Sequence, residues 1–347
     1  MRNLLLLLTL LILITGLSGP IYAQGPTGGG SLVRDITGGA DLIFRPPKDP
    51  IVDSLVSGGP TPGGGKTTGK KGKVPAKSAP KQDQIIAKAN AARSAPKPRY
   101  AEAEQQYNLA AQIAPTDARA YAGLGNVYVD QARFAEAVEA YGKALKLKPD
   151  YRAAYLPLAF SLARLNKYPE AIELYNKIIK DEPDNPEAYN NLSFAYNQTE
   201  RYQEAVEASQ QAIKLLGETG QAYTQGFQER EELLSYAYKN LGNAYNGLKR
   251  YDDAANALKK AVAIEPTNAA GHFNLGLALY NAGRYSEAIE AYREVIKLRP
   301  TLAQAHYNLG ITYYAVNDRK SVMDQYEVLK GLNPELAQRL YQLLKGQ

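Results

Sequence analysis

The strongest constraint on the fold is a period of 34 residues in the spacing of prolines. The prolines that follow this period form two sets of three, which are Pro115, Pro149 and Pro183, then Pro266, Pro300 and Pro334. The spacing from Pro183 to Pro266 is 83 residues, which is two periods plus 15 residues. A fixed period of this length is typical of proteins in which each repeat is one supersecondary unit. The sequence therefore predicts a chain of repeats with one insertion.

A frame that places each proline near the end of its unit gives seven units and puts the insertion at 220–234. The units are 84–117, 118–151, 152–185, 186–219, 235–268, 269–302 and 303–336. The insertion is rich in Gln, Glu and Arg, so we expect it to lengthen the first helix of the fifth unit. Residues 337–347 continue a run of leucines at helical spacing, which predicts a C-terminal capping helix.

The second unit shows how one repeat folds. Tyr121, Leu124, Gly125 and Tyr128 share one face of a first helix, and Ala137, Tyr141 and Ala144 share one face of a second. Because small residues alternate with large ones, two antiparallel helices can approach closely, with a tyrosine opposite a small residue. The proline near the end stops the second helix. Each unit is thus predicted to be a helical hairpin. In unit 152–185, Pro157 would lie inside the first helix and would destabilise it to some extent.

These residues resemble the tetratricopeptide repeat family, whose unit of 34 residues has a bulky residue, Leu-Gly, Tyr, Ala, an aromatic residue, Ala and Pro in these slots. The Leu-Gly pair occurs at 124–125, 241–242, 275–276 and 309–310. Unit 84–117 keeps only the second half of the signature, and Gly217, Ser209 and Val322 depart from it. The resemblance implies an all-α, right-handed superhelical solenoid, here at 84–336, whose first helices line a concave groove.

The composition argues against catalysis. The chain has no cysteine and only two histidines, which excludes thiol nucleophiles and thiolate metal sites. His272 and His306 lie one period apart in the bulky slot, where tyrosines stand in other units, and no further ligand is in phase with them. Of the 26 tyrosines, 25 follow residue 99, mostly in repeat slots. We expect a non-enzyme without metal or cofactor.

The N-terminal quarter differs in character from the repeats. An apolar run at 4–15, followed by small residues up to Ala23, predicts a signal peptide at 1–23 that is cleaved after Ala23, as in a secreted or periplasmic protein. The alternative is that this segment stays uncleaved and anchors the protein. Residues 24–83 are rich in Gly, Pro and Lys and predict a disordered linker. Its lysines, among them Lys66, Lys70, Lys71 and Lys73, either contact an anionic surface or only keep the linker soluble.

Charge in the repeats is balanced, with 31 basic and 30 acidic side chains after residue 83. Binding to a nucleic acid needs clustered cations, so we expect no nucleic-acid partner. In the groove, one slot of the first helix holds an asparagine in four units, which are Asn191, Asn240, Asn274 and Asn308. Such a column is similar to the asparagine ladder of repeat domains that bind extended peptides, although asparagine is also a common polar filler.

Lys239 and Asn243, together with Asn274 of this column, also resemble part of a clamp for two carboxylates. The clamp would need two more cations, and Gln304 and Asn308 stand there instead. A neutral peptide groove is therefore favoured, with Tyr236, Tyr280 and Tyr314 as aromatic anchors. The sequence thus predicts a scaffold of the cell envelope or the secreted compartment that binds a protein or peptide segment, or an adaptor whose lysines hold an anionic surface.

Overall fold

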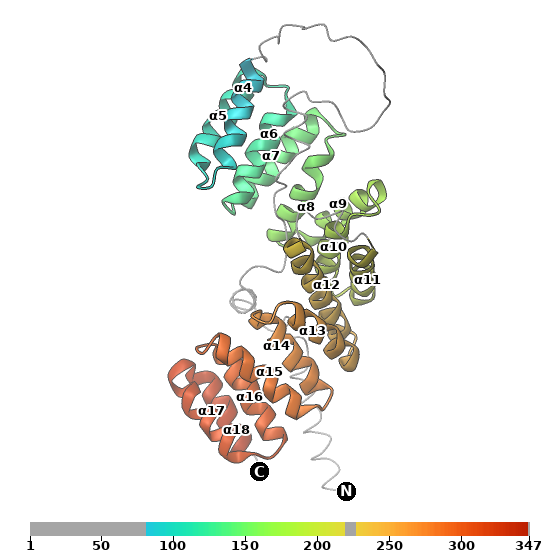
Figure 1. Cartoon of the computed structure of the whole chain (residues 1–347). Helices are drawn as coiled ribbons and strands as arrows, with labels where there is room; N and C mark the ends of the chain where they lie inside the picture. The colour runs from blue at the N-terminus through green and yellow to red at the C-terminus, as the bar shows by residue number, and fades with distance from the viewer. Residues whose placement is uncertain (1–80, 219–226, 346–347) are drawn as a thin grey trace. The chain divides into compact units, whose positions relative to one another are not determined.

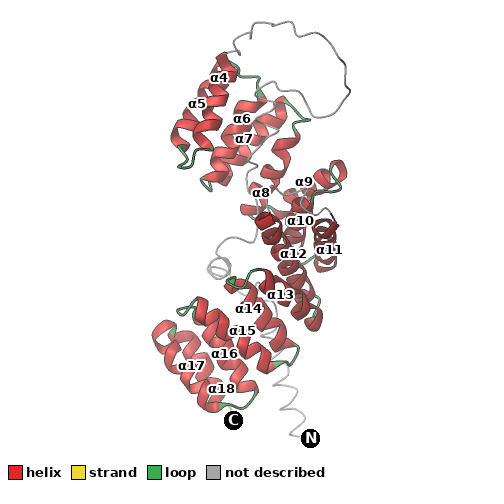
Figure 2. Cartoon of the chain, in the orientation of Figure 1, coloured by secondary structure: helices red, strands yellow, loops and turns green. Residues whose placement is uncertain are grey.

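The computed structural model describes residues 81–218 and 227–345, and the described residues form fifteen α-helices and one short 3₁₀-helix (Figure 2). They divide between Pro183 and Asp184 into two compact units, each described by itself below (Figure 1). The signal peptide predicted at 1–23, most of the predicted linker and the lysines at 66, 70, 71 and 73 lie outside the described residues.

The N-terminal unit contains three hairpins, built from α4 (Lys81–Arg93) and α5 (Tyr100–Ile113), α6 (Ala118–Asp130) and α7 (Phe134–Leu147), and α8 (Tyr155–Arg164) and α9 (Tyr168–Asp181). The first hairpin has a complete first helix, although its sequence lacks that half of the signature. Ile86 and Ala89 of α4 are buried against α5 and α6. Repeat structure therefore begins at Lys81, inside the segment predicted as linker.

The C-terminal unit contains four hairpins and a last helix. They are α10 (Pro186–Gln198) and α11 (Tyr202–Glu218), α12 (Phe227–Gly247) and α13 (Tyr251–Ile264), α14 (Ala269–Asn281) and α15 (Tyr285–Leu298), α16 (Ala303–Ala315) and α17 (Arg319–Leu332), then α18 (Pro334–Lys345). Two helices are longer than the rest. α11 has 17 residues, because Gly217 stands where other units have a helix-stopping proline, and α12 has 21, because it includes the end of the insertion.

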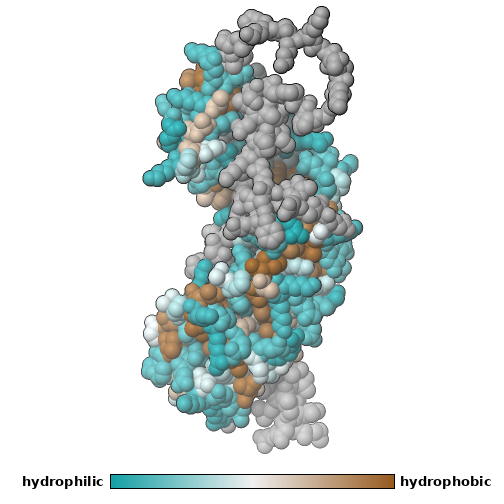
Figure 3. All heavy atoms as spheres, in the orientation of Figure 1, coloured by the Kyte–Doolittle hydropathy of each residue, from teal (hydrophilic) through white to brown (hydrophobic). Residues whose placement is uncertain are grey.

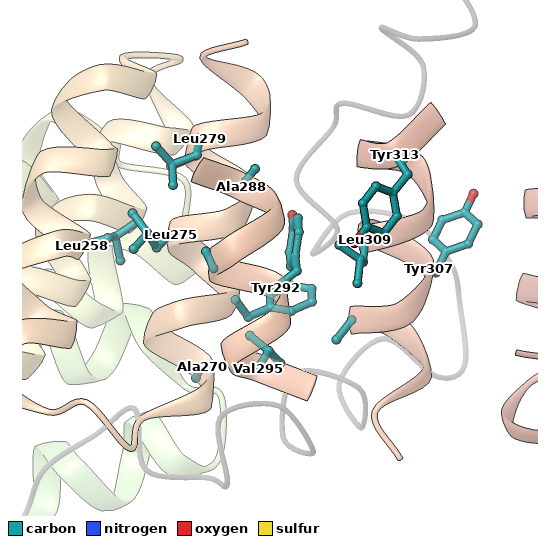
Figure 4. Packing of buried hydrophobic residues seen from close by; sticks show 14 of the residues in the cluster. Leu258, Ala270, Leu275, Leu279, Ala288, Tyr292, Val295, Tyr307, Leu309 and Tyr313 are labelled. Carbon is teal, nitrogen blue, oxygen red and sulfur yellow. The ribbon is translucent and has the colours of Figure 1, made fainter. Parts of the chain in front are cut away.

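Close packing inside two of the hairpins depends on the glycine of the Leu-Gly pair. A Cβ atom on Gly125 would lie 2.6 Å from the ring of Tyr141, and one on Gly276 would lie 2.8 Å from the ring of Tyr292. Both tyrosines are fully buried, and Figure 4 shows Tyr292 in one core cluster with Leu275 and Leu309. The predicted alternation of small and large residues is confirmed in both units.

One departure from the signature has a compensating partner. Ser209 replaces the aromatic residue of its hairpin and is buried, and Ser193 stands in the slot where other units have glycine. The two hydroxyl oxygens lie 2.5 Å apart, and the Ser193 hydroxyl also lies 2.9 Å from the carbonyl oxygen of Ala205. A hydrogen-bonded pair of small residues thus fills the space of a glycine and a tyrosine.

Pro157 is accommodated differently from the prediction. The 3₁₀-helix η1 (Arg152–Ala154) takes the place of the first turn, and α8 begins only at Tyr155. Pro157 is therefore in the first turn of α8, where a backbone N–H has no acceptor within the helix. The expected cost of an interior proline is avoided because the helix starts later.

The turn inside most hairpins has one residue with a positive φ. Gly283 has a φ of 74°, and non-glycine residues hold the same slot at Ala132, Asn166, Glu200, Lys249 and Asn317. After each of them the chain closes a six-residue turn, as where the N–H of Arg284 donates to the carbonyl oxygen of Leu279 at 2.8 Å. This shared turn sets the same geometry in the six hairpins from α6 to α17.

In both units the first helices of successive hairpins contact one another. For example, α4 contacts α6, and α12 contacts α14. Among the described residues, no second helix contacts the next second helix to the same degree. The first helices therefore form the more tightly packed layer of each unit, which we call its inner layer. Large apolar side chains exposed elsewhere are spread over several helices, in agreement with the separate hydrophobic areas of the face in Figure 3.

Candidate functional site

All nine residues predicted to line the groove lie on first helices of the C-terminal unit. Asn191 is on α10, whereas Tyr236, Lys239, Asn240 and Asn243 are on α12, Asn274 and Tyr280 are on α14, and Asn308 and Tyr314 are on α16. The structure thus brings the predicted residues to one inner layer, but it gives them different surroundings.

The first two asparagines of the predicted column are buried. Asn240 is 1% exposed, and its Nδ2 donates to Oδ1 of Asn190 at 3.0 Å. The Nδ2 of Asn197 in turn donates to the carbonyl oxygen of Asn240 at 2.9 Å. Asn191 is likewise fully buried. The asparagines of α10 and α12 therefore stabilise the contact between these two helices.

Further along the inner layer the amides are more accessible. Asn243 and Asn274 are both half-buried, and Nδ2 of Asn274 donates to Oδ1 of Asn243 at 2.9 Å. Among the described residues this is the one hydrogen bond of either side chain. The pair therefore offers a ligand on the inner layer one donor, Nδ2 of Asn243, and one acceptor, Oδ1 of Asn274.

A second amide pair follows on α16. Nε2 of Gln304 donates to Oδ1 of Asn308 at 3.0 Å, and Nδ2 of Asn308 lies 3.4 Å from the hydroxyl oxygen of Tyr292. Asn308 is buried, whereas Gln304 is half-buried. Sequence reasoning treated Gln304 only as a missing cation, yet its Oε1 is an acceptor on the inner layer.

The single lysine of the predicted set is held by an aromatic ring. Nζ of Lys239 lies 4.4 Å from the ring centre of Tyr236, which is a cation–π distance, and both side chains are buried. Neither Gln304 nor Asn308 carries a charge that would complete a carboxylate clamp. The geometry here favours neutral amides over charged donors as the contacting groups.

Tyr280 and Tyr314 lie one period apart on α14 and α16, the first helices of two successive hairpins. Tyr280 and Tyr314 are half-buried, and the ring of Tyr280 lies 5.5 Å from that of Tyr285. Burial, together with Tyr285 and Tyr307, raises the pKa of Tyr280 above its usual value. Its hydroxyl therefore stays neutral at physiological pH. The same slot holds Asn246 on α12, which sequence reasoning missed and which comparing this slot across units would have found.

Formal charge is absent from two neighbouring first helices of this inner layer. α14 and α16 contain no Asp, Glu, Lys or Arg. The first helices of the N-terminal unit do carry ion pairs. Nε of Arg93 lies 2.6 Å from Oδ2 of Asp130, and Nη2 of Arg119 lies 2.8 Å from Oδ1 of Asp83.

The two histidines have structural hydrogen bonds. Nε2 of His272 lies 2.9 Å from the carbonyl oxygen of Pro266, and Nε2 of His306 lies 2.9 Å from that of Pro300. The hydroxyl of Tyr155 donates at 2.7 Å to the carbonyl of Pro149 in the same slot. Histidine thus replaces tyrosine in one repeated contact. In the described ranges no group of three or more His, Asp or Glu could hold a metal ion.

The helices of residues 81–218 and 227–345 are all too short or too polar to cross a membrane. This finding covers the described part of the chain and therefore does not extend to the apolar run at its N-terminus.

Two family models match the chain. Residues 101–223 match the tetratricopeptide repeat domain of cytochrome c-type biogenesis protein H, and residues 242–283 and 278–317 match the general tetratricopeptide repeat. No curated protein matches the chain.

Several solved structures are similar in fold. One chain of the APC/C hetero-tetramer Cut9–Hcn1 is 22% identical with a TM-score of 0.55, over 67% of this chain and 42% of its own length. A tetratricopeptide repeat protein from Parabacteroides merdae is 16% identical with a TM-score of 0.53, over 76% of this chain and 98% of its own. PilF of Pseudomonas aeruginosa is 22% identical with a TM-score of 0.52, over 65% of this chain and 96% of its own.

These likenesses agree with the fold of helical hairpins described above. Proteins of this family generally mediate interactions between proteins. The chain is a member of the tetratricopeptide repeat family.

Proposed function

We propose that the protein is a non-catalytic interaction scaffold that binds an extended, uncharged peptide segment on the inner layer of its C-terminal unit. The observation that carries this proposal is the Asn243–Asn274 pair, which presents one donor and one acceptor beside two helices without formal charge. An extended peptide offers one C=O and one N–H per residue, so the pair matches its backbone and demands little of its side chains.

Electrostatics favour a neutral ligand. A charged side chain placed over α14 and α16 would lose water and find no opposite charge on these helices, which is costly. An uncharged segment avoids that loss. The exposed parts of Tyr280 and Tyr314 add apolar area at which such a segment can be anchored.

Buried acceptors on the same layer are consistent with a polar ligand. Oδ1 of Asn246 is buried and accepts no hydrogen bond from the described residues, and the same holds for Oδ1 of Asn197. An unpaired buried acceptor costs on the order of 1–3 kcal/mol. Asn246 lies about one helical turn from Asn243 on the same first helix.

The test compares two pools of blocked peptides of equal length, one without charged residues and one with alternating Lys and Glu. We expect the full chain to select the uncharged pool and Asn243→Ala with Asn274→Ala to weaken the selected peptide at least about tenfold, which is 1.4 kcal/mol. Raising the salt concentration should leave the affinity unchanged, since no ion pair is involved.

Asn256→Ala is the matched control, because Asn256 is an exposed asparagine on the second helix α13 and should not affect binding. Preference for the charged pool, or equal binding by the double variant and the parent, would refute the proposal. Thermal unfolding of each variant shows whether a loss of binding reflects a loss of the fold.

We also propose that the protein acts outside the cytoplasm, in the cell envelope or after secretion. The predicted signal peptide supports this, and so does the match to a domain of a cytochrome c biogenesis protein. Mass spectrometry of the protein from fractionated cells should give a mature N-terminus at Gln24. An intact Met1 in the membrane fraction would indicate an anchor instead, and an intact chain in the cytosol would contradict the proposal.

A further inference from the structure

We infer that the peptide bound by the C-terminal unit is a proline-rich segment of another protein in the polyproline II conformation. This inference rests on the proposed function and specifies its ligand. It follows from the repeat spacing of the binding groups, from the kind of groups that repeat and from the missing charge.

The first step concerns spacing. Tyr280 on α14 and Tyr314 on α16 occupy the same slot one period apart, and both rings are half-buried on the inner layer. The neighbouring first helices α14 and α16 are in contact, and packed helices lie about 8–10 Å apart. A ligand that uses each group in turn must repeat at about this distance.

Polyproline II meets this requirement and a β-strand does not. A polyproline II helix has three residues per turn and rises about 3.1 Å per residue, so equivalent groups recur about every 9 Å. A β-strand repeats every two residues, which is about 6.7 Å. Only the first conformation keeps one residue in three above successive hairpins without bending the ligand.

The second step concerns the groups themselves. The groups that recur are aromatic rings, and the Asn243–Asn274 pair lies on the same inner layer. Aromatic-lined surfaces recognise proline because the flat ring packs on the pyrrolidine. Proline has a C=O but no N–H, which suits the donor of Asn243, and one other residue per turn can supply an N–H to Oδ1 of Asn274.

The third step concerns charge and entropy. Because α14 and α16 have no formal charge, affinity must come from apolar contact and neutral hydrogen bonds. These are weak singly, so a ligand that is already extended in solution loses less conformational entropy on binding. A repeat of the type X-Pro-Pro, with an uncharged X, combines this preorganisation with the required period.

The experiment uses the full chain and three blocked peptides of equal length, made of four copies of Ala-Pro-Pro, Ala-Gly-Gln or Glu-Pro-Pro. We expect Ala-Pro-Pro to bind at least about tenfold more tightly than either of the others. Equal binding of Ala-Pro-Pro and Ala-Gly-Gln would refute the polyproline II inference but leave the neutral-peptide function intact. Binding of neither neutral peptide, by the parent or by the chain with Pro46, Pro47 and Pro50 replaced by serine, would refute both.

Two substitutions at Tyr314 separate ring contact from folding. Tyr314→Phe keeps the ring and should retain affinity for the Ala-Pro-Pro peptide, whereas Tyr314→Ala should lower it at least about fivefold with the helix content unchanged. Equal affinity of both variants and the parent would overturn the assignment of this ring to proline.

The chain's own Pro46, Pro47 and Pro50 are a competing occupant. Replacing all three by serine should leave the affinity for the Ala-Pro-Pro peptide unchanged if the partner is another protein. Binding that appears only after this replacement would assign the inner layer to the chain's own segment and overturn an outside partner.

Discussion

The inner layers of the two units use the same helices for different chemistry. In the N-terminal unit, α4 and α6 are joined by the Arg93–Asp130 pair, and Arg119 bridges Asp83 and Asp117. In the C-terminal unit, amides join the first helices, and α14 and α16 are without formal charge.

The comparison shows which slots are free to vary. The faces that close each hairpin are alike, since a glycine lies under a buried tyrosine at Gly125 and Tyr141 as at Gly276 and Tyr292. The inner slots point away from that contact, so a change there leaves the glycine–tyrosine packing in place. One repeat can thus support a charged face in one unit and a neutral face in the other.

The largest expected effect tests whether the two cores are equivalent. Tyr141→Ala and Tyr292→Ala each remove a buried ring and should each cost about 3–5 kcal/mol. Because a repeat contacts mainly its neighbours, we expect amide exchange to rise chiefly in the unit that carries the substitution. Hydrogen exchange measured by peptide mass spectrometry reports this. A uniform rise in both units would show that they unfold together.

A smaller effect distinguishes the inner layers. Arg93→Ala leaves the carboxylate of Asp130, whose side chain is 10% exposed, without its cation, and should cost about 2–3 kcal/mol. Asn274→Ala removes one neutral hydrogen bond at a half-exposed site and should cost less than about 1 kcal/mol. Urea unfolding gives both values.

The combined change of Arg93→Met and Asp130→Leu is the control, because removing both charges avoids the unpaired carboxylate and should restore most of the stability. Equal losses for Arg93→Ala and Asn274→Ala would mean that the ion pair contributes no more than an amide pair.

The smallest effect depends on pH. Burial alone would raise the pKa of Asp117, but hydrogen bonds from the side chain and backbone of Arg119 outweigh it and keep this pKa below its usual value. A carboxyl with a lowered pKa stabilises the fold fully above its unfolded pKa of about 4 and loses that effect as the pH falls. Asp117→Asn should therefore cost up to about 1 kcal/mol at pH 7 and progressively less below about pH 4.

Asn268 provides the matched comparison, because it caps α14 in the slot where Asp117 caps α6. Its Oδ1 accepts from the N–H of Gly271 at 3.0 Å and does not titrate. Because its Nδ2 donates to Oε2 of Glu265 at 2.9 Å, the substitution is compared in chains that carry Glu265→Gln, where the cost of Asn268→Ala, about 1 kcal/mol, should be the same at pH 7 and pH 3. Chemical denaturation at both pH values checks this contrast, and equal pH dependence at the two caps would contradict it.

Much of the fold could be predicted because the hairpin contacts are local. Helix faces, small-to-large pairs and stopping prolines recur at a fixed period, so Gly125 opposite Tyr141 follows from spacing alone. The pairing of Ser193 with Ser209 did not follow, since neither serine matches the signature and only their contact explains both. The complete first helix α4 also escaped, because alanines carry most of its buried face.

The site was predicted less well for a related reason. A slot number gives the side of a helix, but the depth of a side chain depends on how closely the next helix packs. Asn240 and Asn274 share one slot, yet the first is buried under the α10 contact and the second is half-exposed. The hydrogen bond between the side-chain amides of Asn243 and Asn274 joins two different slots. It appears only when neighbouring hairpins are placed together.

The sequence by itself determined the repeat, its hairpins and the absence of charge on α14 and α16, because these depend on residue types at short and regular separations. The tertiary structure alone decided where each unit begins and ends, how Pro157 is accommodated and which inner amides remain able to bind. Those outcomes depend on distances between helices that lie a full repeat or more apart in the chain, and no local pattern encodes such distances.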